Sequence, residues 1–241
     1  MTRRGSRDTL RLTTLGVGAA APPRYAPAGL LVERAGVRVM IDGGPGAAPA
    51  GRLAAWLVTD ERAELMPRIR VLARAKGLEP CARSFDANGL AIERRLVVHT
   101  NHPTFGYLIR AGGQWVVWAP EFLQFPRWAS GAGLMFAEAA GWRRPIRFRG
   151  GVGGHLDATA VAIAASRCRI RRLVFAHIGR PTLRAIDRGE VPPFGEFGAD
   201  GRRYVLGGRR TACGAARKRA KRPRLPAQGR MTMSSTGRPA P

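Results

Sequence analysis

Short apolar runs bounded by Gly, Pro or Asp recur along the first half of the chain and are typical of β-strands. Such runs occupy residues 10–16, 29–33, 37–41, 54–58, 90–99, 104–110 and 115–118. The Gly-rich segment 111–113 separates the last two runs and is typical of a tight turn. We therefore predict a strand over each run and a hairpin over the last pair.

Apolar side chains at helical spacing predict a helix over residues 61–76 that stops at Gly77. A second helix is predicted over 156–166, followed by a strand over 173–176. The chain begins with predicted strands, and the predicted helices follow at intervals between later strands. The pattern therefore predicts an α/β (α+β) fold in which two sheet-and-helix halves pack face to face.

The size of the chain fits one folded domain. With 241 residues and 45% hydrophobic side chains, it can bury one substantial core. We expect this domain over residues 1–208 and a separate tail over residues 209–241. No apolar run approaches the roughly 20 residues of a membrane span, and the first residues lack the apolar stretch of a secretory signal. We therefore expect no membrane contact and a cytoplasmic location.

The number and spacing of the cysteines also favour a cytoplasmic location. Cys81, Cys168 and Cys213 are odd in number, widely spaced and form no C-x-x-C pair. This spacing indicates neither a disulfide framework nor a structural zinc site.

The formal net charge of +25 is shared between the two parts of the chain. Residues 209–241 hold ten Lys or Arg and no Asp or Glu, which leaves +15 on the first 208 residues. A folded part this basic favours anionic partners through phosphate contacts and counterion release. A coding bias is the alternative, because Lys76, Lys218 and Lys221 are the only lysines. Such a bias explains the choice of Arg over Lys but not the scarcity of acidic residues.

The basic tail over 209–241 has few apolar residues to bury and is rich in Pro, Gly and Ser, so we predict that it is disordered. Residues 217–224 could contact RNA or DNA non-specifically through their charge. A solvated tail without any partner is the alternative.

Four segments carry a resemblance to a known family. They are LTTLGVGAAAPPRYAPAGLLVERAGVRVMIDGGPG (12–46), HTNHPTFGYLIRAGGQWVVWAP (99–120), FAEAAGW (136–142) and GGHLDATAVAIAASRCRIRRLVFAHIGRP (153–181). In this order they resemble the metallo-β-lactamase-fold hydrolases, in particular the ribonuclease Z and cyclic-phosphodiesterase branch. The resemblance covers residues 10–206 and implies a four-layer αββα sandwich.

The chain departs from that family where the metal ligands usually stand. The family carries T-H-x-H-x-D-H, whose imidazole and carboxylate groups bind two zinc ions, whereas this chain has TDERAEL at residues 59–65. Asp60 stands at the first His position, Arg62 at the second, Glu64 at the Asp and Leu65 at the last His. Because Arg62 and Leu65 offer no lone pair to a cation, a two-zinc centre is not expected.

The remaining residues could hold one divalent ion. The resemblance places His99, Glu121 and His177 at further metal positions, with His102 as a rival for His99. Asp60 and Glu64, four residues apart, would face the same side of a helical turn. A mixed set of carboxylates and imidazoles suits Zn, Mn or Fe.

Further residues have proposed roles beside the metal. By resemblance, His155 would donate a proton to the leaving group, and the start of the following helix could face an anion. A plain Gly-rich turn at this position is the alternative. Arg180 and Arg62 would offset phosphate charge. Glu138 either binds a histidine behind the site or caps a strand.

The expected activity is hydrolysis of a phosphodiester or a similar anionic ester, on a small molecule or a nucleic acid. The alternative is a metal-free member of the fold that binds an anionic ligand or nucleic acid, with the guanidinium of Arg62 replacing the charge of a metal. Whether the chain forms a homodimer stays open.

Overall fold

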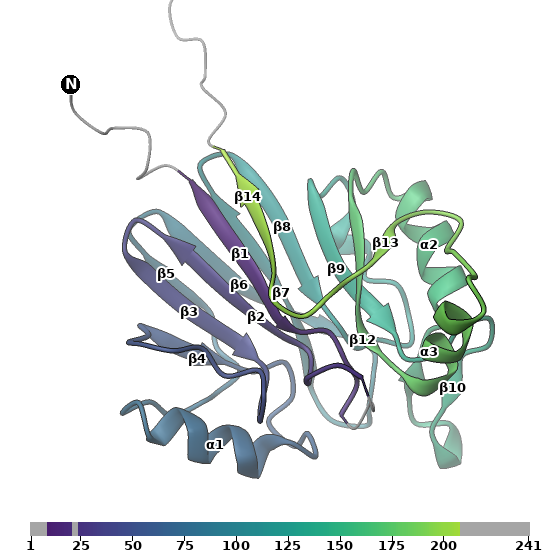
Figure 1. Cartoon of the computed structure of the whole chain (residues 1–241), viewed down its shortest axis with the longest axis horizontal. Helices are drawn as coiled ribbons and strands as arrows, with labels where there is room; N and C mark the ends of the chain where they lie inside the picture. Colours follow the sequence, from purple (N-terminus) through teal and green to yellow (C-terminus); the bar gives the residue numbers. More distant parts are fainter. Residues whose placement is uncertain (1–8, 21–23, 208–241) are drawn as a thin grey trace, which may run out of the picture. The chain divides into compact units, whose positions relative to one another are not determined.

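The computed structural model describes residues 9–20 and 24–207, and within them two β-sheets face each other (Figure 1). The first sheet has five strands in the order β14-β1-β2-β3-β4. Its pairs are antiparallel except β3 with β4. The strands are β1 (Leu10–Gly16), β2 (Gly29–Arg34), β3 (Val37–Asp42), β4 (Ala55–Leu57) and β14 (Arg202–Leu206).

The second sheet has seven strands in the order β13-β12-β9-β8-β7-β6-β5. They are β5 (Phe85–Ala87), β6 (Leu90–Val97), β7 (Thr104–Ala111), β8 (Gln114–Ala119), β9 (Leu134–Ala139), β12 (Leu173–Ile178) and β13 (Glu196–Phe197). A separate hairpin pairs β10 (Ile146–Arg147) with β11 (Gly154–His155). Because β8, β9 and β12 run parallel, their carboxyl ends lie at one edge of the sheet.

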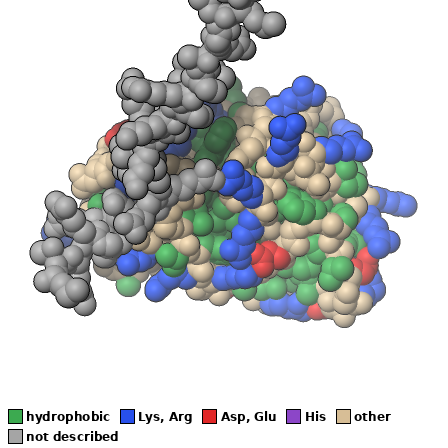
Figure 2. Space-filling view, turned by 90° about the horizontal axis from the view of Figure 1, so that it is seen from above, with side chains coloured by type: hydrophobic (Ala, Val, Ile, Leu, Met, Phe, Trp, Pro, Cys, Tyr) green, Lys and Arg blue, Asp and Glu red, His purple; other side chains and the backbone are tan. Residues whose placement is uncertain are grey.

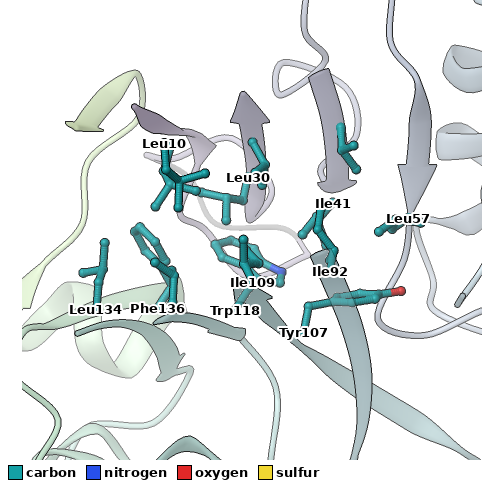
Figure 3. Packing of buried hydrophobic residues seen from close by; sticks show 14 of the residues in the cluster. Leu10, Leu30, Ile41, Leu57, Ile92, Tyr107, Ile109, Trp118, Leu134 and Phe136 are labelled. Carbon is teal, nitrogen blue, oxygen red and sulfur yellow. The ribbon is translucent and has the colours of Figure 1, made fainter. Parts of the chain in front are cut away.

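The main core fills the space between the sheets. Leu10, Leu30 and Ile41 from the first sheet meet Ile109 and Trp118 from the second (Figure 3). Side chains alternate along the strands, because successive residues of a strand point to opposite faces. In β9, Leu134 and Phe136 therefore point into this core, whereas Met135 and Ala137 point to the other face.

Helices cover the outer face of each sheet. The helix α1 (Met66–Arg74) packs on Met40 and Trp56 of the first sheet. The helices α2 (Ala158–Arg167) and α3 (Arg180–Asp187) pack on the outer face of the second sheet. The predicted four-layer αββα sandwich is thereby confirmed.

The helix predicted over 61–76 begins later than expected, at Met66. Pro67 explains the difference, because proline is tolerated in the first turn of a helix but breaks a helix interior. Residues 60–65 form turns instead. The prediction that Asp60 and Glu64 share one side of a helical turn is therefore wrong.

The helix predicted over 156–166 begins at Ala158, after Asp157 as its N-cap. The Asp157 carboxylate accepts a hydrogen bond from the Ala160 N–H, and the Ala158 N–H donates to the Gly141 carbonyl. This helix end already carries a carboxylate. That the helix start also faces a substrate anion stays a prediction.

The sequence patterns missed several elements. The strand β9 was not predicted, although it is buried on both faces like β12, which was predicted. The short helix α3 starts at Arg180-Pro181, directly after β12. The strand predicted over 90–99 ends at Val97, which leaves His99 in a turn.

Other sequence predictions concern charge, the tail and membranes. Lys and Arg side chains outnumber Asp and Glu on the face shown in Figure 2. The tail at 209–241 lies outside the described residues, so its predicted disorder and nucleic-acid contact stay predictions. Among residues 9–20 and 24–207, no helix has the length and apolar composition needed to cross a bilayer.

Asp42 connects the two sheets at the end of β3. Its Oδ1 accepts hydrogen bonds from the Thr59 N–H at 2.7 Å and the Thr59 hydroxyl at 3.0 Å. Its Oδ2 accepts from the indole N–H of Trp118 in the second sheet, at 2.7 Å. Burial raises the pKa of Asp42 to about 7, although these hydrogen bonds oppose the shift.

We predict that Asp42→Ala lowers the free energy of unfolding by about 2–4 kcal/mol. The change leaves the buried N–H groups of Thr59 and Trp118 without an acceptor, and it puts Ala at a φ of 54°. Urea denaturation followed by circular dichroism measures the effect. Asp86→Ala on the exposed face of β5 is the control and should change stability by less than about 0.5 kcal/mol. Equal effects of the two variants would contradict the role of Asp42.

Candidate functional site

One cavity of about 580 Å³ gathers the residues that the sequence singled out. They come from the turn after β4, the loop between β6 and β7, the loop after β8, the strand β11, the end of β12 and the start of α3. The predicted site residues that line it are Asp60, Arg62, Glu64, His99, Glu121, His155, His177 and Arg180. Residues far apart in the chain thus meet in one place, at the edge where the parallel strands end.

Glu121 stands between two histidines in this cavity. Its Oε1 lies 2.8 Å from His177 Nε2, and its Oε2 lies 3.2 Å from His99 Nε2. His99 donates through Nδ1 to the Gly154 carbonyl at 2.9 Å, which orients its ring. Two imidazole Nε2 atoms and one carboxylate therefore converge on the same point of the cavity wall.

Glu138, which β9 places behind this wall, is fully buried. Its oxygens accept hydrogen bonds from the backbone N–H groups of Phe122 at 3.1 Å and Ala140 at 2.8 Å. They also face His155 Nδ1 at 2.7 Å and His177 Nδ1 at 3.4 Å. The structure shows both roles considered for Glu138, because it contacts two histidines and also accepts from the N–H group that follows β9.

Glu138, His155 and His177 each offer one ligand atom within 4.8 Å of the others, so they form a group that could hold a metal ion. The oxygens of Glu138 are, however, already occupied by two backbone donors and two imidazoles. With Nδ1 bound to Glu138, His155 and His177 keep Nε2 for another ligand. The open ligand atoms of this cluster are therefore the Nε2 atoms rather than the Glu138 oxygens.

The chemistry of the donor set fits a cation. Both nitrogens of His177 face carboxylates, and both nitrogens of His99 face oxygen acceptors. Without a metal, each ring must carry two protons to satisfy these acceptors. A divalent ion at the Nε2 atoms would replace the protons on that side and neutralise Glu121.

These contacts shift the proton equilibria of the cluster. Burial alone would lower the pKa of His177, but the charge and hydrogen bonds of Glu121 and Glu138 raise it to about 10. Burial would also lower the pKa of His99, but the hydrogen bond with Glu121 and the charge of Glu121 raise it. Burial would raise the pKa of Glu121, but the charge of His177 holds it well below its usual value.

Asp60 is paired with a different histidine. His102 Nε2 lies 2.9 Å from Asp60 Oδ1, and the same oxygen accepts a hydrogen bond from the Arg62 N–H at 2.7 Å. His102 and His99 both line the cavity, but His99 is the one that contacts Glu121.

The remaining predicted residues lie at the exposed edge of the cavity. Arg62 and Glu64 are exposed on the turn before α1, and Arg180 is exposed as the first residue of α3. None of the three forms an ion pair with another described residue.

Solved structures share this arrangement of sheets and helices, although no protein-family model and no curated protein matches the sequence. The protein YhfI from Bacillus subtilis is described as a metallo-β-lactamase-fold protein. It is 16% identical, with a TM-score of 0.63 over 83% of this chain and 100% of that chain. This chain has the metallo-β-lactamase fold.

Two further structures with this fold are similar to the chain over nearly their whole length. A diphosphatase of the PhnP family is 16% identical, with a TM-score of 0.60 over 82% of this chain and 97% of that chain. The short form of human tRNase Z is 15% identical, with a TM-score of 0.55 over 82% of this chain and 99% of that chain. At these identities the likeness establishes the fold alone.

Among the cavity residues that the sequence analysis of this metallo-β-lactamase-fold chain did not predict are Asp42 and Phe148. Asp42 lines the cavity, and the Asp-Gly-Gly turn after β3 could have indicated this. Phe148 also lines it and packs edge-on against His99, with ring centroids 5.4 Å apart. The segment at Gly153 packs directly against the backbone of His99, and only glycine fits there, because a Cβ would lie 2.0 Å from the His99 carbonyl oxygen.

We predict that the metal-free protein loses stability as the pH rises from about 7 to about 10. The pKa of His177 is higher in the folded state than the 6.5 of an unperturbed histidine. The stabilisation is thus complete below about 6.5 and is lost as the pH passes the folded value. Urea denaturation at several pH values, after any metal has been removed with a chelator, measures this loss of stability. His177→Gln should flatten the decline, and parallel curves for the two proteins would argue against this ion-pair cluster.

Proposed function

We propose that this chain is a hydrolase that uses one divalent metal ion to cleave a phosphodiester or a similar anionic ester. The observation that carries the proposal is the convergence of His99 Nε2 and His177 Nε2 on Glu121. The same cavity has the guanidinium groups of Arg62 and Arg180 at its edge. A cation site beside two fixed positive charges suits a substrate with negative charge.

His99, Glu121 and His177 would hold the ion, which leaves part of its coordination shell for water and substrate. Zn, Mn or Fe suits two imidazoles and one carboxylate. One ion is favoured over two because Arg62 and Leu65 stand where the resembling family has histidines. Asp60 and Glu64 are additional candidate ligands, although Asp60 is already paired with His102.

The bound ion would supply Lewis-acid activation of water and of the ester. The residues of the chain then have separate roles. Arg62 and Arg180 bind the anionic oxygens of the substrate. His155 keeps its Nδ1 on Glu138, so its Nε2 is the atom that holds the proton for the leaving oxygen. Glu138 orients His155 and His177 from behind the cavity.

The similar structures support phosphate chemistry by their names, since one is a diphosphatase and another a tRNase Z. The basic composition of the chain favours an anionic substrate as well. A nucleic-acid substrate, tail contacts with nucleic acid, a homodimer and a cytoplasmic location stay predictions.

A second candidate function is binding of an anionic ligand or nucleic acid without a metal. The pairing of Asp60 with His102 favours it, because one of the carboxylates in the cavity is already satisfied by an imidazole. Protonated His99 and His177 could likewise satisfy Glu121. The metal content of the purified protein separates the two functions.

We expect the purified protein to contain close to one equivalent of Zn, Mn or Fe and to hydrolyse bis(p-nitrophenyl) phosphate. Glu121→Gln should lose both the metal and the activity, because it removes the charge between the two Nε2 atoms. Elemental analysis and release of p-nitrophenol measure the two effects. Glu93→Gln in β6, a residue that does not line the cavity, is the matched control and should keep both. Absence of metal and of turnover with every added ion would reject the enzyme and leave the binding function.

We predict that Glu138→Gln weakens metal binding by about 10- to 100-fold. In this variant one carboxylate oxygen becomes an NH₂ group, which donates hydrogen bonds and cannot accept them. His155 or His177 therefore loses the acceptor of its Nδ1–H group. Isothermal titration of the metal-free protein with Zn²⁺ measures the affinity, and Glu93→Gln again serves as the control. An unchanged affinity would show that Glu138 does not orient the ligands.

A further inference from the structure

One wall of the cavity is apolar where the turn before α1 meets the first sheet. Leu65 and Ile69 lie on this wall, one helical turn apart, and the Ile69 N–H donates to the Leu65 carbonyl at 2.9 Å. Residues four apart share one face of a helix, so the two side chains extend one surface. The apolar residues lining the cavity on this side are Pro27, Ala63, Leu65 and Ile69.

The turn at Gly44 joins this wall to the first sheet. A Cβ placed on Gly44 would lie 3.8 Å from Leu65 Cδ1 and 3.6 Å from Pro27 Cγ. Leu65 and Pro27 therefore border the same small region above the Gly44 backbone. Leu65 is only half-buried, whereas Ile69 is 4% exposed, so Leu65 keeps surface that a ligand can cover.

The charged groups near this wall already have partners or lie at its edge. The Asp60 carboxylate is held by His102, and the Glu121 carboxylate by His99 and His177. Glu64 is exposed to solvent. A charged group placed on Leu65 would lose water without gaining an ion-pair partner from these carboxylates, whereas an apolar group would gain from burial.

We propose that Leu65 and Ile69, with Pro27, form a subsite for an aryl or branched alkyl group of the substrate. The inference rests on the proposed function and narrows its substrate to an anionic ester that carries such an apolar group. The negative end of the substrate lies toward Arg62, Arg180 and the Glu121 cluster. The cavity volume of about 580 Å³ is within the range that holds a small organic ligand.

The experiment compares two anions that share one head group. Phenylphosphonate and methylphosphonate are titrated calorimetrically into the full chain with its metal. We expect phenylphosphonate to bind about tenfold more tightly, because its ring buries more apolar surface. Leu65→Asn should bring the two dissociation constants together, and Leu65→Met should keep them apart.

Val71→Asn is the matched control. Val71 lies on the same helix, is 70% exposed and does not line the cavity, so this variant should keep the tenfold preference. Equal binding of both phosphonates to the unmodified chain would overturn the subsite alone. The same holds if Leu65→Asn keeps the full preference. Failure of both phosphonates to bind would overturn the proposed anionic-ester site together with the subsite.

Discussion

The Glu138 carboxylate is the interaction on which the candidate site depends. It is fully buried at the end of β9, and its two oxygens bind the backbone after β8, the backbone after β9 and two imidazoles. A buried charge of this kind is tolerated only when each of its lone pairs has a donor. Its burial therefore forces His155 and His177 into one orientation, with Nε2 toward the cavity.

The second constraint is charge balance in a small volume. Glu121 and Glu138 are close to His99, His155 and His177, and the histidines can neutralise the carboxylates only by carrying extra protons. A divalent cation does the same with fewer protons, so metal binding and protonation compete for the same nitrogen atoms. Arg62 and Leu65 reduce the number of ligands on the other side of the cavity. The site thus combines a cluster that could hold a metal ion with an apolar wall.

The sequence predicted most of the short apolar strands that Gly, Pro or Asp residues bound, and it predicted the general order of the layers. It failed where one residue changes the local geometry. Pro67 delays the start of α1, and Asp157 caps α2, which begins at Ala158, two residues after the predicted helix start. The strand β9 was missed, although it is as fully buried as β12, which was predicted. The resemblance placed His99, Glu121 and His177 in one pocket, but it could not decide which atoms face each other.

By itself, the sequence determined the chemistry available to this protein: few histidines, few acidic groups, many arginines and a turn without its usual metal ligands. Those properties depend on residue identity alone. The tertiary structure decided that His99 rather than His102 contacts Glu121, that Asp60 pairs with His102, and that Glu138 holds two histidines. The reason is physical, because hydrogen bonds and ion pairs act over about 3 Å, and only the tertiary fold brings residues 17 to 42 positions apart within that distance.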